Sequence, residues 1–297
     1  MEAADAITLV QLMASALILG YGSFTDWKTR KAKNELWLAL SGVGIVLLPL
    51  QVMDRELPLG ALLILVPILA ILSDIYLDSE GESLWNRAAP YAKYGVAVAS
   101  IVILAWFWPR DLDSAHFLAI PVMMLVIVLM YMVDIVRGGA DAKSLIALSI
   151  IFPYYPAIGS FPLLSPDNWH AQIVFPFSFV VLINAAIIVA LLPIAFAVKN
   201  ISAHEFEYPF GFLGYKMDVE SARSKFVWLM ERIEDGKLVR YTRPKREENL
   251  ESELDLLAKA GHKRVWITPK VPFIIPIFIS LIFSVIVGNL LLLIAPL

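Results

Sequence analysis

Residues 116–141 read HFLAIPVMMLVIVLMYMVDIVRGGAD, and this stretch decides what kind of protein the chain forms. The segment from Phe117 to Val133 carries no charge. A helix needs about 20 apolar residues to cross the hydrocarbon core of a bilayer. We therefore interpret residues 116–136 as a membrane-spanning helix. Two glycines and an aspartate then interrupt the apolar sequence, which resumes directly after Asp141.

The composition of the whole chain agrees with this interpretation. Of its 297 residues, 59% are hydrophobic and 17% are charged, and the mean hydropathy is +0.72. Soluble globular chains carry about 25% charged residues. We therefore predict an all-α polytopic membrane protein of about eight transmembrane helices. The absence of cysteine excludes disulfides, thiolate zinc sites and a cysteine nucleophile.

Apolar segments long enough to cross a membrane recur along the chain. We expect spans at 6–24, 36–52, 58–76, 92–109, 116–136, 141–162, 171–198 and 271–296. The sixth is the least regular, because proline-rich PYYPAIGSFP follows its first eleven residues. The N-terminus is acidic rather than basic, so we expect its apolar segment to stay in the mature protein. These spans define a transmembrane domain at 1–198, a soluble domain at 199–270 and a C-terminal transmembrane helix at 271–297.

The distribution of lysine and arginine predicts how the chain is oriented. Cytoplasmic loops of membrane proteins carry an excess of both residues. Eight spans with both termini outside place all of them on the cytoplasmic side except Arg55 and Arg110. If the sixth span did not cross, most of them would lie outside. In the favoured topology, Asp26 and Asp141 both lie at the cytoplasmic face.

The soluble segment 199–270 is expected to form a small α+β cytoplasmic domain. We predict a helix from Asp218, as its N-cap, to Gly236. The alternating apolar residues of GKLVRYTRP and KRVWITPK predict two short strands. Between them, EENLESELDLLAKAGHK predicts a second helix that ends at Gly261.

Four aspartates lie close to a predicted membrane face. An ionisable side chain there costs free energy unless it is compensated, so each of the four calls for an explanation. Asp134 precedes Arg137 by three residues, which is suitable for an ion pair on a helix surface. The position of Asp74 is explained without catalysis if its carboxylate group reaches the lipid headgroups. Asp141 follows Gly138, Gly139 and Ala140, and glycine permits positive φ and close approach of another chain. The alternative for Asp141 is a helix cap after a two-glycine turn.

Asp26 begins a basic segment that contains Lys28, Arg30, Lys31 and Lys33. A positive stop signal, or a contact with anionic headgroups, would explain this cluster without catalysis. Two aspartates at helix ends on one membrane face nevertheless fit an aspartyl protease. Close carboxyl groups share a proton, so that the ionised one activates water and the protonated one binds the scissile carbonyl. Such a pair titrates jointly, and the chemistry requires no metal or cofactor.

These residues match a known pattern. Asp-x-Lys/Arg-x-Arg-x-x-x-Asn occurs at Asp26–Asn34, and Gly-x-Gly-Asp has its counterpart at Gly138–Asp141, with Ala140 in place of the second glycine and Lys143 after it. The pattern resembles the type IV prepilin peptidase family of GxGD membrane aspartyl proteases. It is most similar to the archaeal preflagellin peptidase branch, which carries a cytoplasmic domain before the last transmembrane helix.

The resemblance implies that Asp26 and Asp141 are the catalytic pair. It implies roles in substrate approach for Gly138, Gly139 and Ala140, and supporting roles for Lys28, Arg30, Asn34 and Lys143. The substrates would be preflagellin or pilin-like precursors, cleaved at the cytoplasmic face of the plasma membrane behind a short basic leader. We expect no cofactor, metal or nucleic acid, and no methylation of the product. Asp78, Glu80 and Glu82 either attract the basic leader or form a solvated loop.

Two other functions remain open from the residues alone. A proton-coupled transporter would use intramembrane acids such as Asp74 and Asp134, together with paired broken helices in repeated halves. A non-catalytic scaffold that presents the domain at 199–270 would require neither Asp26 nor Asp141.

Overall fold

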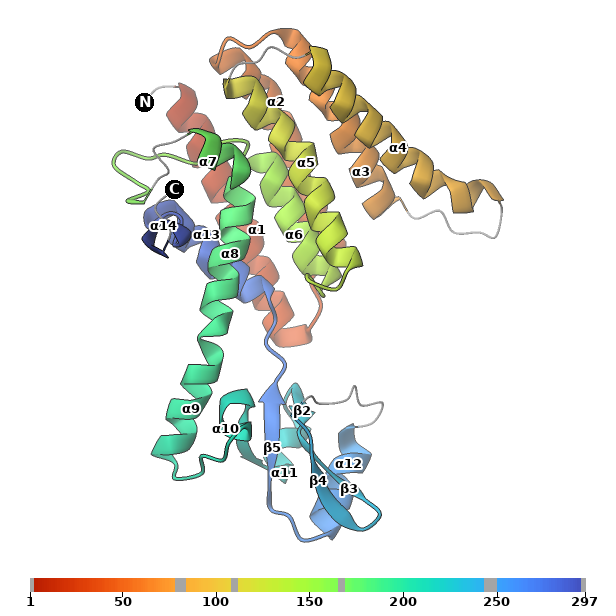
Figure 1. Ribbon diagram of the computed structural model, residues 1–297, viewed down its shortest axis with the longest axis vertical. Helices are drawn as coiled ribbons and strands as arrows, with labels where there is room; N and C mark the ends of the chain where they lie inside the picture. The colour runs from red at the N-terminus through yellow and green to blue at the C-terminus, as the bar shows by residue number, and fades with distance from the viewer. Residues whose placement is uncertain (1–2, 78–83, 108–111, 165–168, 243–249, 295–297) are drawn as a thin grey trace. The chain divides into compact units, whose positions relative to one another are not determined.

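The computed structural model describes residues 3–77, 84–107, 112–164, 169–242 and 250–294 of the chain (Figure 1). It divides the chain into two compact units. Unit 1 comprises Met1–Ala186 and Pro272–Leu297, and unit 2 comprises Ile187–Val271.

Unit 1 is built from helices. Their bounds are α1 (Ala3–Thr29), α2 (Asn34–Asp54), the 3-10 helix η1 (Leu59–Ile64), α3 (Leu65–Tyr76), α4 (Leu84–Phe107), α5 (Leu112–Met132), α6 (Gly139–Ile151), α7 (Trp169–Val174), α8 (Phe177–Ala190, which ends in unit 2), α13 (Ile274–Ile286) and α14 (Leu291–Ile294). Six helical stretches of the described chain are long and apolar enough to cross a membrane: Ala4–Thr29, Asn34–Asp54, Leu59–Tyr76, Ala89–Trp106, Ala115–Met132 and Phe177–Ser202. The predicted fold class, a polytopic helical membrane protein with a small α+β region, is confirmed.

Two of the eight predicted spans contain, among the described residues, no helix long enough to cross a membrane. The span predicted at 141–162 contains α6, and the span predicted at 271–296 contains α13 and the four-residue α14; α6 and α13 each have 13 residues. Thirteen residues rise about 20 Å, less than the roughly 30 Å of a hydrocarbon core. Pro153 follows the end of α6 and cannot supply the next helical N–H. Gly288 follows α13 with a φ of +99°, a conformation that a helix does not contain.

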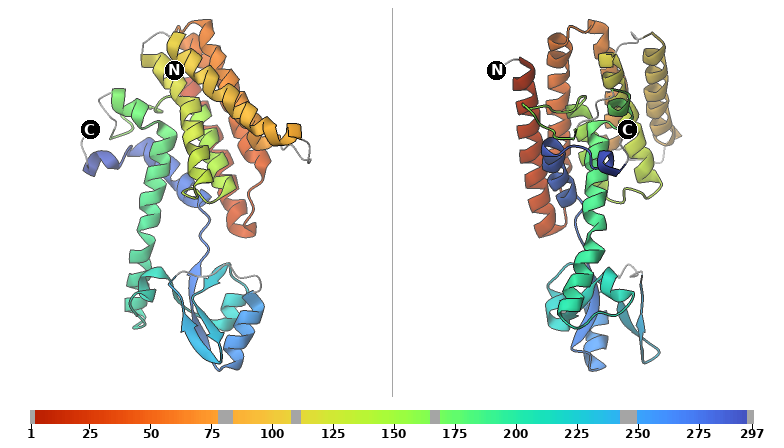
Figure 2. Two further views of the ribbon diagram at one scale, coloured as in Figure 1. Left: turned by 45° about the vertical axis from the view of Figure 1, so that its right-hand side comes forward. Right: turned by 60° about the vertical axis from the view of Figure 1, so that its left-hand side comes forward.

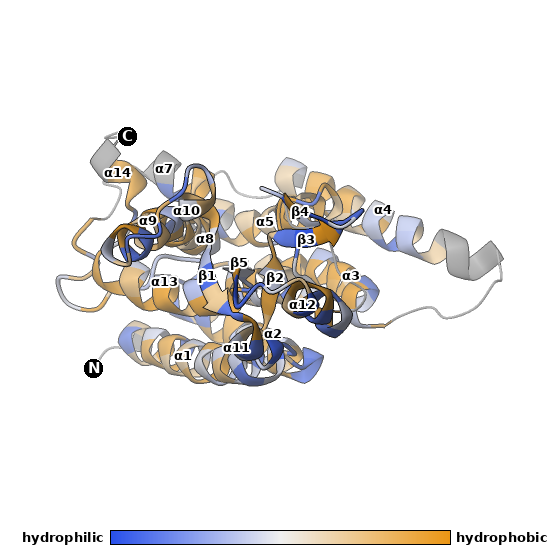
Figure 3. Ribbon diagram, turned by 90° about the horizontal axis from the view of Figure 1, so that it is seen from below, coloured by the Kyte–Doolittle hydropathy of each residue, from blue (hydrophilic) through white to orange (hydrophobic). Residues whose placement is uncertain are grey.

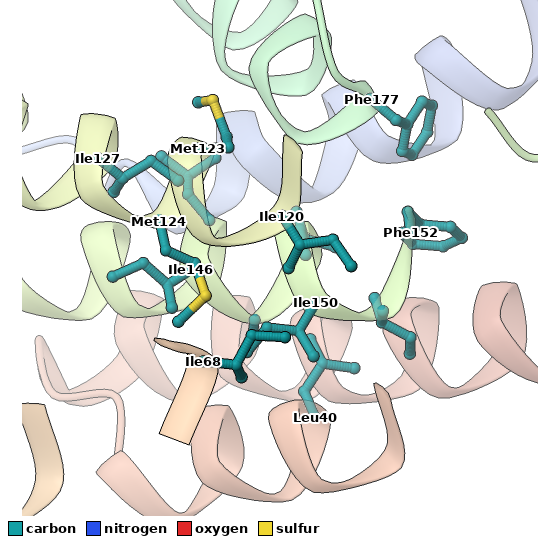
Figure 4. Close-up of a cluster of buried hydrophobic side chains, with 14 of the residues drawn as sticks. Leu40, Ile68, Ile120, Met123, Met124, Ile127, Ile146, Ile150, Phe152 and Phe177 are labelled. Carbon is teal, nitrogen blue, oxygen red and sulfur yellow. The ribbon is translucent and has the colours of Figure 1, made fainter. Parts of the chain in front are cut away.

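Helix α6 lies at the centre of unit 1, in contact with α1, α2, α5 and α13 (Figure 2). Its residues from Ser144 to Ile151 are all buried. Figure 4 shows Ile146 and Ile150 of α6 among side chains of α2, α3 and α5. Helix α2 comes especially close, because a Cβ on Gly44 would lie 3.0 Å from the backbone of Ile151. Helix α6, which carries Asp141, is therefore fixed in place by packing contacts on several sides.

The irregular segments that follow α6 and α13 pair their backbone polar groups within the protein. The Leu163 and Leu164 N–H groups donate to the carbonyls of Ile286 and Val287, at 3.0 and 2.7 Å. The buried Asn184 amide donates to the Gly288 carbonyl at 2.9 Å. A membrane interior offers no water for such groups, so irregular backbone there has to be paired inside the protein.

Unit 2 combines short helices with two small sheets. It contains α9 (Leu192–Ser202), α10 (Phe210–Leu213), β1 (Tyr215–Asp218), α11 (Val219–Arg223), β2 (Val227–Leu229), β3 (Glu231–Glu234), β4 (Lys237–Arg240), α12 (Leu250–Lys259) and β5 (Arg264–Pro269). One sheet is antiparallel with the order β1-β5-β2, and β3 and β4 form a hairpin. Residues from β1, β2, β5, α11 and α12 form a separate hydrophobic core. Figure 3 shows α12 largely hydrophilic, whereas α3 and α5 are largely hydrophobic.

The predicted helix between Asp218 and Gly236 is wrong. Helix α11 spans only five residues after Asp218, and β2 and β3 follow it. Val227 and Leu229 are buried while Trp228 between them is partly exposed, which is the alternation of a strand. Pairing of β2 with β5 therefore outweighs the helical propensity of this segment. The predicted second helix and two strands coincide with α12, β4 and β5.

Candidate active site

Asp26 lies in the last turn of α1. Arg30 ends the helix with a φ of +56°, and its N–H still donates to the Asp26 carbonyl at 2.9 Å. One turn earlier, a Cβ on Gly22 would lie 2.8 Å from the ring of the fully buried Trp37 in α2. Close contact between α1 and α2 thus fixes the position of the partly buried Asp26.

Asp141 lies in the first turn of α6, where the free N–H groups and the helix dipole favour negative charge. Gly138 precedes the helix in an extended conformation, with φ −91° and ψ 123°. A Cβ there would lie 2.0 Å from Asp141 Oδ2. Gly138 is therefore required for space beside the carboxyl group, rather than for the positive φ that the sequence suggested. Ala140 lies inside the helix, where alanine is fully compatible.

The carboxyl groups of Asp26 and Asp141 lie close enough for their charges to interact. Asp141 lies outside the six membrane-crossing stretches, and burial raises its pKa to about 7, with a second contribution from the Asp26 charge. A carboxyl group with this pKa is substantially protonated at neutral pH. The structure thus brings together two acids separated by 114 intervening residues, in an environment that keeps a proton on the pair.

The predicted supporting residues divide into those that join the two motifs and those that do not. The Lys143 ammonium donates to Asn34 Oδ1 at 2.9 Å, which links the first turn of α6 to the start of α2. Arg30 interacts electrostatically with Asp26. Lys28 is exposed and lies over the Phe24 ring, 4.6 Å from its centroid.

The other acids considered above lie elsewhere. Asp74 of α3 is 3.8 Å from the ammonium group of Lys93 in α4. Asp134 has a φ of +60° in the turn after α5, so the helical ion pair predicted with Arg137 does not apply. The acidic residues Asp78, Glu80 and Glu82 lie outside the described residues.

A groove of about 920 Å³ opens beside Gly139, between α3, α4, α5 and α6. Its lining is mainly apolar, with Asp74 and Lys143 among the residues that face it. One wall consists of Gly139, Ala142 and Ile146, which are spaced as one face of a helix. That spacing is visible in the sequence, but the other walls come from distant helices. Sequence reasoning therefore missed the groove.

Two comparisons with known proteins bear on this arrangement. Residues 207–290 match the protein family described as Archaeal Peptidase A24 C-terminus Type II. The chain is also 29% identical over 157 residues to the protein named Preflagellin peptidase of Methanocaldococcus jannaschii. That match covers 51% of this chain and 63% of the relative's length. Both findings support the resemblance inferred from the Asp26 and Asp141 motifs.

Proposed function

We propose that this chain is a membrane aspartyl endopeptidase. The comparisons support its membership of the preflagellin peptidase branch of the prepilin peptidase family. It removes the short basic leader of preflagellin or pilin-like precursors at the cytoplasmic membrane face. Asp26 and Asp141 form the catalytic pair. The observation that supports this proposal is that the buried Asp141, at the start of α6, lies within electrostatic range of Asp26, so that one acid from each motif acts on the other.

The chemistry requires one ionised and one protonated carboxyl group. The ionised group takes a proton from water, and the resulting hydroxide attacks the carbonyl carbon of the scissile peptide bond. The protonated group donates a hydrogen bond to the carbonyl oxygen, and the leaving amine takes up a proton as the bond breaks. The pKa of about 7 at Asp141 supports such sharing. Because the pair titrates jointly, the two roles belong to the pair.

The surroundings suit a peptide substrate at a membrane surface. An extended leader can approach the backbone at Gly138 and Gly139, where side chains do not obstruct main-chain hydrogen bonds. The apolar residues that follow the leader fit the groove beside Gly139, whose lining is mainly apolar. In the proposed orientation, residues 199–270 form a cytoplasmic domain.

Leader cleavage by the purified full-length protein in liposomes tests the proposal. The variants Asp26→Asn and Asp141→Asn should each lose cleavage by about 10²- to 10⁴-fold, the usual contribution of a general acid or base. Asp134→Asn is the control, because Asp134 lies in a turn and should be dispensable. Each variant is first compared with wild type by thermal unfolding. Full cleavage by both folded Asn variants would refute the aspartyl mechanism.

The transporter alternative can be separated in the same liposomes. Both α6 and α13 are broken helices, a feature that transporters share. However, neither acid that the transporter hypothesis would use belongs to α6 or α13, because Asp74 lies in α3, 3.8 Å from Lys93, and Asp134 lies in the turn after α5. Loss of proton-linked uptake in Asp26→Asn with leader cleavage intact would favour transport. A scaffold would tolerate both aspartate variants in either assay.

A further inference from the structure

Tyr131 carries a hydroxyl group that the chemistry of the catalytic pair does not use. It lies in the last turn of α5, one residue before the helix ends at Met132, and it is 46% exposed. Among the residues that the structure describes, none forms a hydrogen bond with this hydroxyl. A phenol without an internal partner can donate to a bound molecule.

The Tyr131 hydroxyl lies beside the two glycines that precede the catalytic acid. A Cβ on Gly139 would lie 3.6 Å from the Tyr131 hydroxyl oxygen, whereas a Cβ on Gly138 would lie 2.0 Å from Asp141 Oδ2. The two consecutive glycines therefore have different polar groups next to them, the carboxyl group at Gly138 and the phenol at Gly139. Helices α5 and α6 pack directly against each other, which holds the phenol in this position (Figure 1).

The backbone at these glycines is open to an extended peptide. Gly138 and Gly139 are both partly exposed, and no side chain caps the first N–H groups of α6. Free N–H groups at a helix start can donate to the main chain of a substrate. Consecutive Cα atoms lie about 3.8 Å apart, so the phenol and the carboxyl group are within about four residues of each other along an extended strand that advances about 3.3 Å per residue.

Tyr131 also lines the groove of about 920 Å³ beside Gly139. In the proposed function, the scissile bond lies at Asp141 and the apolar residues that follow the leader enter this groove. The Tyr131 hydroxyl is therefore placed where the precursor passes from the scissile bond into the groove. An extended main chain entering a mainly apolar lining has carbonyl groups that need hydrogen-bond donors, because an unpaired polar group there costs free energy.

We propose that Tyr131 is a substrate-binding residue, whose hydroxyl donates a hydrogen bond to a main-chain carbonyl among the first residues after the scissile bond. This inference rests on the proposed function and adds a contact on the far side of the cleavage point from the leader. The contact holds the precursor extended between Asp141 and the groove. Since it binds the main chain, it is the same for precursors that differ in side chains.

The alternative role for Tyr131 is that of an anchor at the membrane–water interface, where tyrosine is common. Tyr21 of α1 provides a control for the loss of an exposed hydroxyl. It is 59% exposed, lies in the membrane-crossing stretch Ala4–Thr29 and is not among the residues that line the groove. An anchor role predicts that Tyr21→Phe and Tyr131→Phe behave alike, whereas substrate binding predicts that only Tyr131→Phe changes cleavage.

Steady-state cleavage of a pilin-like precursor by the full-length protein in liposomes tests the proposal. Phenylalanine keeps the ring and removes only the hydroxyl. We expect Tyr131→Phe to raise KM about 3- to 10-fold, the usual contribution of one hydrogen bond, with kcat within about two-fold of wild type. Tyr21→Phe should leave both parameters unchanged, and both variants should unfold at the wild-type temperature.

Photo-cross-linking supplies a second measurement that does not depend on turnover. The photoreactive residue p-benzoylphenylalanine replaces Tyr131 in the Asp26→Asn protein, which should bind the precursor without cleaving it. We expect cross-links to the precursor within about four residues after the scissile bond. The same photoreactive residue in place of Tyr21 should give no cross-link to that part of the precursor.

Three results would overturn the proposal: unchanged KM in Tyr131→Phe, a lower kcat at unchanged KM, or cross-links from position 131 that reach only lipid or the leader. Each of them leaves the catalytic pair intact if cleavage still requires Asp26 and Asp141. Full cleavage by the Asp26→Asn and Asp141→Asn variants would instead refute the proposed function itself. The two kinds of failure are therefore distinguishable.

Discussion

At the scale of single residues, the absence of a side chain at Gly138 leaves the space that the Asp141 carboxyl group occupies. Gly138→Ala places a methyl group 2.0 Å from Asp141 Oδ2, while the φ of −91° itself accepts alanine. The carboxyl group must therefore move, and a displacement of about 1 Å can lower activity about 10²-fold. We expect kcat/KM for leader cleavage to fall by that order, with little change in thermal unfolding.

Gly139→Ala is the matched control for this prediction. A Cβ at Gly139 would meet only the Tyr131 hydroxyl, at an ordinary contact distance of 3.6 Å. The added methyl group narrows the proposed leader path without displacing Asp141, so KM should rise while kcat stays within a few-fold of wild type. If both alanine variants lost activity equally, the space beside Asp141 would not be the reason for glycine at 138.

The pKa of Asp141 predicts how activity depends on pH. Burial and the Asp26 charge raise this pKa to about 7, so the proton shared by the pair is retained at neutral pH and lost above it. A raised carboxyl pKa means that the active, singly protonated form disappears as pH rises through that value. We expect kcat/KM for leader cleavage to decline above about pH 7. A rate that kept rising to pH 9 would contradict a shared proton.

The residues of the candidate site differ in how far the sequence predicted them. Asp26, Asp141, Asn34 and Lys143 could be selected because they belong to two recognisable motifs. The contact between Asn34 and Lys143 could not be predicted, because it depends on how α2 packs against α6. The role of Gly138 was misjudged for a similar reason, since the Asp141 carboxyl position that requires glycine exists only in the folded chain.

At the scale of elements, the break after α13 depends on Gly288. Gly288 has a φ of +99°, and a Cβ there would lie 1.9 Å from the Leu164 carbonyl oxygen. Gly288→Ala should lower the free energy of unfolding by about 1–3 kcal/mol, the usual cost of a strained backbone position. Thermal unfolding in detergent measures the change.

Gly42→Ala provides the comparison within α2. A Cβ at Gly42 meets no atom within 4 Å, and alanine is favoured over glycine in a helix interior. We expect this variant to be as stable as wild type or slightly more stable. Equal destabilisation by both substitutions would show that the break at Gly288 carries no special strain.

Helix lengths show why part of the fold escaped prediction. Hydropathy locates apolar segments well, because burial in lipid depends mainly on side-chain composition. It does not separate a full span from a helix that stops halfway, and the residues that follow α6 and α13 are uncharged and largely apolar. Pro153 and Gly288 were visible in the sequence, but the pairing of Leu163 and Leu164 with residues 286–287 makes the breaks tolerable. That pairing is a tertiary property.

At the scale of the whole molecule, the two units have separate hydrophobic cores, one formed by the helices of unit 1 and one by the strands and α12 of unit 2. Separate cores favour separate cooperative unfolding. Calorimetry of the full-length protein in detergent should therefore resolve two transitions, and a substitution inside one core should move only one of them.

Arg240→Met tests this separation in unit 2. Its guanidinium donates to Glu231 Oε1 at 2.8 Å, and the other oxygen of the 3% exposed Glu231 accepts from the Trp266 N–H at 3.0 Å. Without Arg240 the buried carboxylate loses its counter-charge, which should destabilise unit 2 by about 2–4 kcal/mol. We expect the transition of unit 2 to move to lower temperature while that of unit 1 stays in place.

Arg223→Met provides the control, because the Arg223–Asp255 pair is exposed and surface pairs contribute little. The same Arg240→Met protein also shows whether cleavage depends on folded unit 2. Cleavage is measured between the two transitions, where unit 2 alone is unfolded. Since Asp26 and Asp141 both belong to unit 1, the catalytic pair stays assembled there. Loss of cleavage in this interval would mean that unit 2 is needed for substrate binding, whereas retained cleavage would confine the reaction to unit 1.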